Sequence, residues 1–171
     1  MVGAYLSRLP NATNVNKSAV GCRIMASGNL NSKLEQFVAA QDPVYDQVLQ
    51  ELKAGQKRTH WIWFIFPQLA GLGTSGMAQK FGIASKAEAK NYLEHAVLGP
   101  RLRECTRLML AIPHGDIGSI MGYPDDLKFR SCMTLFAAVD AEGESIFEEA
   151  LQKFFGGERD PLTLKLLEQG G

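Results

Sequence analysis

Signals for helix starts and ends recur from residue 31 to the C-terminal end of this chain, and they constrain its fold more than any other feature. Ser85 and Glu88 form a capping box, in which each side chain satisfies an unpaired backbone N–H at a helix start. Further signals of this kind are Asp42-Pro43 and Asp160-Pro161 as N-cap pairs and Gly156-Gly157 as a helix end. No strand–helix–strand rhythm interrupts them, so the sequence predicts a mainly α fold.

The aromatic run 61–66, Trp-Ile-Trp-Phe-Ile-Phe, is the longest apolar stretch of the chain. It is far shorter than the roughly 20 residues that span a bilayer, so we expect no membrane association. Its four aromatic side chains supply a large apolar area, which is typical of a central core segment. We therefore predict a single compact helical domain over 31–171, with one short buried strand or irregular apolar segment at 61–66 as the local alternatives to a helical turn.

The charge and cysteine content exclude several classes of protein. The 18 Lys and Arg residues balance 18 Asp and Glu residues, whereas a dedicated nucleic-acid binder carries a basic excess, so we expect no nucleic-acid partner. Cys22, Cys105 and Cys132 have neither disulfide nor zinc spacing. This pattern predicts a reducing, cytoplasmic compartment, and we expect neither a metal site nor a cofactor.

Residues 1–30 differ from the rest of the chain in composition. They contain no Asp or Glu and are rich in Asn, Ser, Ala and Gly, which indicates a disordered or extension segment. A transit peptide is an alternative, because such leaders are also poor in acidic residues. A second alternative is that translation starts at Met25.

The loop 71–76, Gly-Leu-Gly-Thr-Ser-Gly, matches the spacing of the dinucleotide-binding fingerprint. The context contradicts that interpretation, because Pro67 to Ala70 separate the loop from any strand and no second parallel strand follows. A weaker interpretation remains, in which Thr74 or Ser75 either caps the next helix or contacts a phosphate.

Polar residues at the ends of the aromatic run are candidates for function. Trp61 or Trp63 can stack on a nucleobase, while Gln68 supplies oriented hydrogen bonds. His60 is the natural proton carrier, because imidazole titrates near neutral pH. The alternative is that this stretch only builds the core, and that His60 and Gln68 mark where it reaches solvent.

A second polar cluster occupies the apolar stretch 126–136. In a helix Asp126, Arg130 and Thr134 share one face. Lys128, Arg130, Ser131 and Thr134 can then line an anion-binding pocket, because a planar guanidinium suits phosphate or carboxylate. The alternative is a solvated polar stripe on a core helix.

These segments resemble one bacterial family. The residues that carry the resemblance are 59–73, 92–95, 98–102, 126–131, 133–136, 155–157, Asp160 and 163–164. The chain is similar over about 33–168 to the family called domain of unknown function 1810, whose members are often labelled calpastatin automatically. The resemblance implies a compact helical domain and no established activity. A looser similarity, in helical architecture and polar residues, is to the NADAR family of N-glycosidases, which act on ADP-ribose-type or riboflavin-pathway substrates.

The sequence leaves two hypotheses about function. The first is a binder or N-glycosidic hydrolase of a phosphorylated ribosyl or nucleotide-type small molecule, and the second is a non-catalytic helical interaction or oligomerisation domain. The candidate catalytic residues are His60, Asp126 and Asp160, and the candidate ligand-binding residues are Trp61, Trp63, Gln68, Thr74, Ser75, Lys128, Arg130, Ser131 and Thr134. The first hypothesis requires the stretches 59–68 and 126–134 to converge on one cavity.

Overall fold

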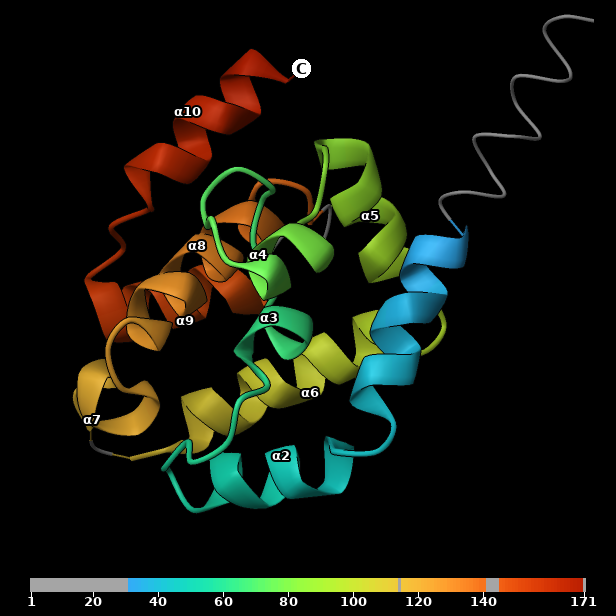
Figure 1. Ribbon diagram of the computed structural model, residues 1–171. Helices are drawn as coiled ribbons and strands as arrows, with labels where there is room; N and C mark the ends of the chain where they lie inside the picture. The colour runs from blue at the N-terminus through green and yellow to red at the C-terminus, as the bar shows by residue number, and fades with distance from the viewer. Residues whose placement is uncertain (1–30, 114, 141–144, 171) are drawn as a thin grey trace, which may run out of the picture.

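The computed structural model describes residues 31–113, 115–140 and 145–170 (Figure 1). The expectations for residues 1–30 lie outside these ranges. A helix over 31–41 comes first among the described residues. The helices that follow are α2 (Tyr45–Lys53), α3 (Ile62–Ile65), α4 (Gly76–Lys80), α5 (Lys86–Glu94), α6 (Leu98–Ala111), α7 (Ile117–Met121), α8 (Asp125–Ala137), α9 (Ile146–Phe155) and α10 (Pro161–Gln169).

The prediction of a mainly α fold is confirmed. In the described ranges, extended pairing is limited to an isolated parallel bridge between Leu69 and Ile83. The local signals also act as expected, since Ser85 caps α5 and Gly156 ends α9 in the left-handed conformation. These elements are fixed by neighbours in sequence, which is why single-residue signals predict them.

The prediction that Asp42 caps a helix at Pro43 is wrong. Helix 31–41 is followed by a turn, and α2 begins only at Tyr45, with Val44 at the N-cap position. The Asp42 carboxylate instead accepts a hydrogen bond from the guanidinium of Arg101 at 2.8 Å. The carboxylate that the local signal assigned to a helix cap is therefore bonded to Arg101, which is distant in sequence.

The run 61–66 forms neither a strand nor an irregular segment. Its central residues make the helical turn α3, and the N–H of Ile65 donates to the carbonyl of Trp61 at 3.1 Å. Apolar side chains surround this turn, and all of them are buried except Trp63, which is half-buried. A short helix whose sides are nearly all apolar shows no periodicity, so the pattern alone does not separate it from a buried strand.

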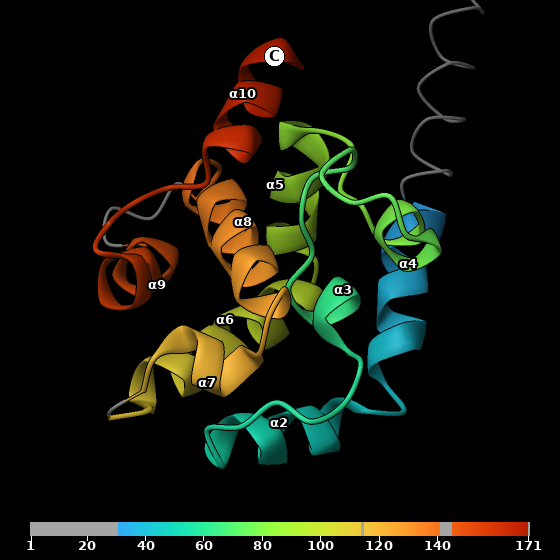
Figure 2. The same ribbon diagram turned by 60° about the vertical axis from the view of Figure 1, so that its left-hand side comes forward.

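The hydrophobic core forms around α3, which packs against both α6 and α8 (Figures 1 and 2). Aromatic rings connect α3 to the C-terminal helices, since the Phe66 and Phe129 ring centroids are 4.8 Å apart in an edge-to-face contact. Helix α8 also packs on α9, α7 and α10. This packing places the segment between α3 and α4 opposite the first turns of α8. Within the described ranges no helix combines the length and the apolar character needed to cross a bilayer.

Candidate functional site

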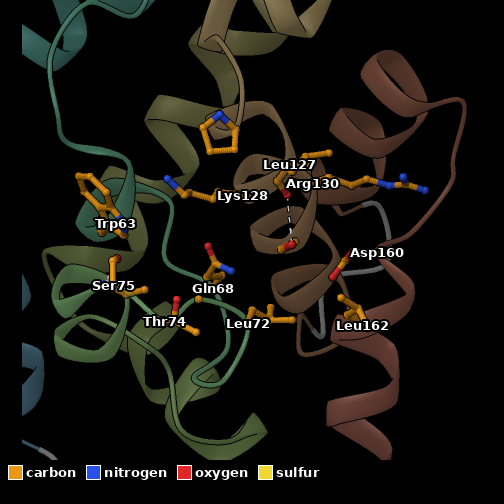
Figure 3. Close-up of a pocket in the computed structure, with 14 residues that line it drawn as sticks. Trp63, Gln68, Leu72, Thr74, Ser75, Leu127, Lys128, Arg130, Asp160 and Leu162 are labelled. Carbon is orange, nitrogen blue, oxygen red and sulfur yellow. Dashed lines mark hydrogen bonds between the residues drawn. The ribbon is translucent and has the colours of Figure 1, made fainter.

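A cavity of about 450 Å³ lies between the segment that connects α3 to α4 and the N-terminal parts of α8 and α10 (Figure 3). The predicted site residues that line it are Trp63, Gln68, Thr74, Ser75, Lys128, Arg130, Ser131 and Asp160. The stretches 59–68 and 126–134 therefore converge on one cavity, as the first hypothesis requires. The roles of these residues stay predictions.

Lys128 lines the cavity and belongs to a triad of charged groups with Asp125 and Lys57, which lie behind it. The Lys128 ammonium lies 4.6 Å from the centroid of the Trp63 ring and 2.7 Å from one Asp125 carboxylate oxygen. The other oxygen of Asp125 lies 2.6 Å from the Lys57 ammonium. Burial raises the pKa of Asp125, but the hydrogen bonds and charges of both lysines outweigh burial and hold the pKa below its usual value. One carboxylate thus balances two cations, which leaves one positive charge beside Trp63.

Several polar groups in the cavity keep unused hydrogen-bonding capacity. Among the described residues, no protein group hydrogen-bonds the side-chain amide of Gln68, the hydroxyl of Thr74 or the Oδ1 atom of Asp160. In Figure 3 Gln68 lies below Lys128, and Asp160 lies on the opposite side of the hollow. Free donors and acceptors in one concave site are typical of a ligand-binding site.

Two serines of the cavity already have structural partners. The hydroxyl of Ser75 accepts a hydrogen bond from the Ala78 N–H and so caps α4. The hydroxyl of Ser131 donates to the Leu127 carbonyl one turn earlier. The capping interpretation of Ser75 is confirmed, and contact with a ligand by either serine stays a prediction.

The guanidinium of Arg130 does not point into the cavity (Figure 3). Its Nε donates to the Glu158 carbonyl at 3.0 Å, and one terminal nitrogen donates to the Glu158 carboxylate and to the Arg159 carbonyl. In this arrangement the guanidinium is not directed at a phosphate in the cavity. These bonds instead hold the segment that leads into α10.

Thr134 is another predicted ligand-binding residue with a structural position. It is fully buried, and its hydroxyl donates to the Arg130 carbonyl at 2.9 Å. The same oxygen accepts the backbone N–H of Asp160 at 2.9 Å. The Asp160 carboxylate caps α10 through its Oδ2 atom, which accepts the Thr163 N–H and hydroxyl. Thr134 therefore positions Asp160 from outside the cavity.

The structure does not bring His60, Trp61 or Asp126 into the cavity. His60 is exposed before α3, whereas Trp61 is only 1% exposed and belongs to the core. The Oδ1 atom of Asp126 is buried, and it has no hydrogen-bond partner among the described residues. Neither of the first two residues lies within α3: His60 belongs to the bend before it, and Trp61 is its N-cap, whose indole N–H donates to Glu51.

Sequence analysis missed a polar cluster around Glu51, which we call the Glu51 cluster (Glu51, Gln47, Arg58, Thr59 and Trp61). The buried carboxylate accepts the Trp61 indole N–H at 2.8 Å, and Gln47, Arg58 and Thr59 donate to it as well. Burial raises the pKa of Glu51, but these hydrogen bonds outweigh burial and lower the pKa from 4.5 to about 2. The sequence signal that could have revealed this cluster is the position of Glu51, three residues after Val48 and next to the apolar stripe of α2.

The described residues contain no group of three or more His, Cys, Asp and Glu side chains arranged to hold a metal ion. The two described cysteines, Cys105 and Cys132, are free thiols inside the core. Burial raises the pKa of the Cys132 thiol well above its usual value. A buried thiol of this kind packs as a small apolar group.

Comparisons with known proteins agree with this helical architecture. A family model described as "Protein of unknown function (DUF1810)" matches residues 31–167. A solved structure, that of the conserved hypothetical protein Rv1873 from Mycobacterium tuberculosis, is 50% identical in sequence and has a TM-score of 0.77. The match covers 79% of this chain and 96% of the mycobacterial chain. No curated protein matches the sequence.

Proposed function

The chain belongs to the DUF1810 family of proteins of unknown function, and from that premise we propose that it binds a nucleotide-type small molecule in the cavity beside Trp63. The observation that carries this proposal is the set of polar groups without a protein partner, Gln68, Thr74 and Asp160 Oδ1 among the described residues, around a single hollow. Gln68 and Asp160 are half-buried, and polar groups at such positions otherwise find partners within the fold, whereas Thr74 is exposed at the edge of the hollow.

The contact between Trp63 and Lys128 supports a ligand that joins an aromatic ring to an anion. The indole offers a flat apolar surface, and the Lys128 ammonium lies directly over it at 4.6 Å from the ring centroid. Lys128 thus covers one face of the indole, and a ligand ring that contacts the rest of the indole surface lies close to a positive charge. A nucleotide has this combination, because its base and phosphate belong to one small molecule.

The volume of the cavity supports a ligand of this size. Small-molecule sites have volumes of about 300–1,000 Å³, and the cavity has about 450 Å³. The Gln68 amide can donate and accept hydrogen bonds at once, which suits the polar edge of a base or a ribose hydroxyl.

Hydrolysis of an N-glycosidic bond is a second candidate function, and the position of Asp160 favours it. In such a reaction positive charge develops at the anomeric carbon, and a nearby carboxylate stabilises it. A water oxygen bonds to that carbon and loses a proton to solvent, while the base leaves with the electron pair of the broken bond. The nicotinamide of NAD leaves as a neutral ring, whereas a base that leaves as an anion takes up a proton. Asp160 supplies the carboxylate, but His60 lies outside the cavity, so the residues that line it include no imidazole to carry the proton.

Binding is tested by isothermal titration and thermal shift with AMP, ADP-ribose and NAD at millimolar concentration. We expect stabilisation by at least one of them, since a ligand at one hundred times its Kd stabilises the folded state by about 2.7 kcal/mol. Gln68→Ala and Lys128→Ala should each weaken binding about tenfold or more, because each removes a direct polar contact. The matched controls are Gln50→Ala and Lys53→Ala, which change exposed residues of α2. Absence of binding by all three compounds would contradict the proposal.

Hydrolysis is tested separately by incubating the protein with NAD and measuring free nicotinamide. Asp160→Asn should abolish product release, because the amide lacks the negative charge. Asn is itself a good N-cap residue, so the variant should still begin α10 correctly. Equal product release by the Asp160→Asn variant would exclude Asp160 from the chemistry.

A further inference from the structure

Two large exposed apolar side chains line the cavity, and a third directly precedes a lining residue in sequence. Within the described ranges, the large hydrophobic residues that face solvent are Tyr123, Leu127 and Leu162, with exposed fractions of 84%, 50% and 61%. Leu127 and Leu162 line the cavity, and Tyr123 precedes Pro124, which also lines it. We call Tyr123, Leu127 and Leu162 the apolar rim.

The apolar rim comes from two separate elements. Tyr123 and Leu127 belong to the start of α8 and the chain before it, while Leu162 lies in the first turn of α10. Figure 3 shows Leu127 and Leu162 with the polar residues Gln68 and Asp160 around the same hollow. A molecule in the cavity therefore meets exposed apolar side chains as well as polar ones.

The size of the apolar rim fits a small molecule better than a protein partner. A stable protein interface buries about 800 Å² on each side and involves about 20–30 residues. The apolar rim has three side chains, and charged or polar residues such as Asp126 and Lys128 lie between them in sequence. Small exposed apolar patches of this kind often belong to ligand-binding grooves.

We propose that the ligand is a nucleotide that carries a second aromatic or apolar group, and that this group lies on the apolar rim while the first ring lies beside Trp63. This inference rests on the proposed function and specifies the class of ligand further. It follows from the two contact surfaces of the site, a half-buried indole next to Lys128 and the exposed apolar rim.

The test compares ADP-ribose with NADH by isothermal titration. Both compounds contain adenine, two ribose units and a diphosphate, and NADH adds one uncharged dihydronicotinamide ring. That ring has no positive charge, so attraction to Asp160 does not explain any gain in affinity. We expect NADH to bind about tenfold more tightly than ADP-ribose, because the additional ring covers apolar surface.

The variants Leu127→Ser and Leu162→Ser should each remove most of this gain, so that NADH and ADP-ribose bind each variant with similar affinities. Both residues are at least half exposed, so the variants should fold as the parent does. The control is Ala138→Ser, an exposed position just after α8, which should leave both affinities unchanged. Circular dichroism and the unfolding midpoint verify the fold of each variant.

Equal affinities for the two compounds in the parent protein, or a gain that persists in both variants, would overturn this inference and leave the proposed function standing. If neither compound nor AMP binds, the proposed function fails, and this inference fails with it. Sedimentation velocity tests the alternative that a second copy of this chain contacts the apolar rim. A dimer of the parent protein that dissociates in both variants would assign the apolar rim to contact between copies and overturn the inference.

Discussion

The Glu51 cluster and the cavity contain similar residues, because each combines a carboxylate, an amide and a tryptophan, yet they differ in how their polar groups are bonded. The Glu51 carboxylate accepts hydrogen bonds from both the backbone and side chains, and Trp61 uses its indole N–H there. In the cavity, the amide of Gln68 has no partner among the described residues. The polar groups of the Glu51 cluster are hydrogen-bonded within the fold, whereas several of those in the cavity are not.

This difference separates structural from functional polarity better than residue type does. Trp61 and Trp63 are two places apart, and the sequence gives no reason to prefer one as a ligand contact. The structure buries Trp61 against Glu51 and leaves Trp63 at the cavity. A polar group that is already bonded inside the protein stabilises the fold, whereas one that keeps free capacity in a hollow is available to a ligand.

Removing Glu51 should have the largest effect on stability. Glu51→Ala leaves several donors buried without an acceptor, so we expect a loss of about 3 kcal/mol or more in the free energy of unfolding. Urea denaturation followed by tryptophan fluorescence measures it, and Glu51→Gln should be intermediate because its amide retains one acceptor oxygen. A loss below about 1 kcal/mol would show that the cluster is not saturated in solution.

The Glu51 cluster should also make stability depend on pH in the acid range. The folded-state pKa of Glu51 is about 2 and its ordinary value is 4.5. The contribution is therefore complete above about pH 4.5 and is lost as the pH falls toward 2, because protonation then favours the unfolded chain. Urea denaturation at intervals between pH 6 and pH 2 should show a smaller acid-induced loss for Glu51→Gln than for the parent protein. Parallel curves would contradict the assigned pKa.

Thr134→Val should have an intermediate effect. The variant keeps the shape of the side chain but removes the oxygen that accepts the Asp160 N–H, at a cost of about 1–2 kcal/mol. It should also weaken ligand binding without any direct contact, because Asp160 loses the bond that positions it. Thermal denaturation and titration with the best ligand measure the two effects, and an unchanged midpoint would remove Thr134 from this structural role.

Gln68→Ala should have the smallest effect on stability and a clear effect on binding. Its amide has no protein partner in the described structure, so the free energy of unfolding should change by less than about 0.5 kcal/mol. The same variant should lose about tenfold in ligand affinity. A destabilisation as large as that of Glu51→Ala would remove the distinction between the two regions.

Local signals predicted much of the fold from the sequence. The caps at Ser85 and Asp160 and the helix end at Gly156 depend on residues within a few positions, and all three occur in the structure. The assignment at Asp42 is wrong because its partner, Arg101, is 59 positions away. Long-range pairing of this kind has no signature in residue type or spacing.

The sequence predicted which segments form the candidate site, but not which of their side chains face the cavity. The two polar stretches were identified, and they do meet at one cavity. Which members face the cavity depends on helix rotation and on distant partners. Arg130 is the clearest example, because its bonds to Glu158, 28 positions away, turn its guanidinium from the cavity.

The attachment of the segment before α10 to α8 has a consequence for the energetics of recognition. Lys128 belongs to α8, and Asp160 is held to the same helix through Thr134 and the guanidinium of Arg130. Lys128 and Asp160 are thus both fixed relative to α8, and the distance between their charges is set before any ligand binds. Such preorganisation lowers the entropic cost of association, so the ligand that we propose should match the fixed separation of Lys128 and Asp160.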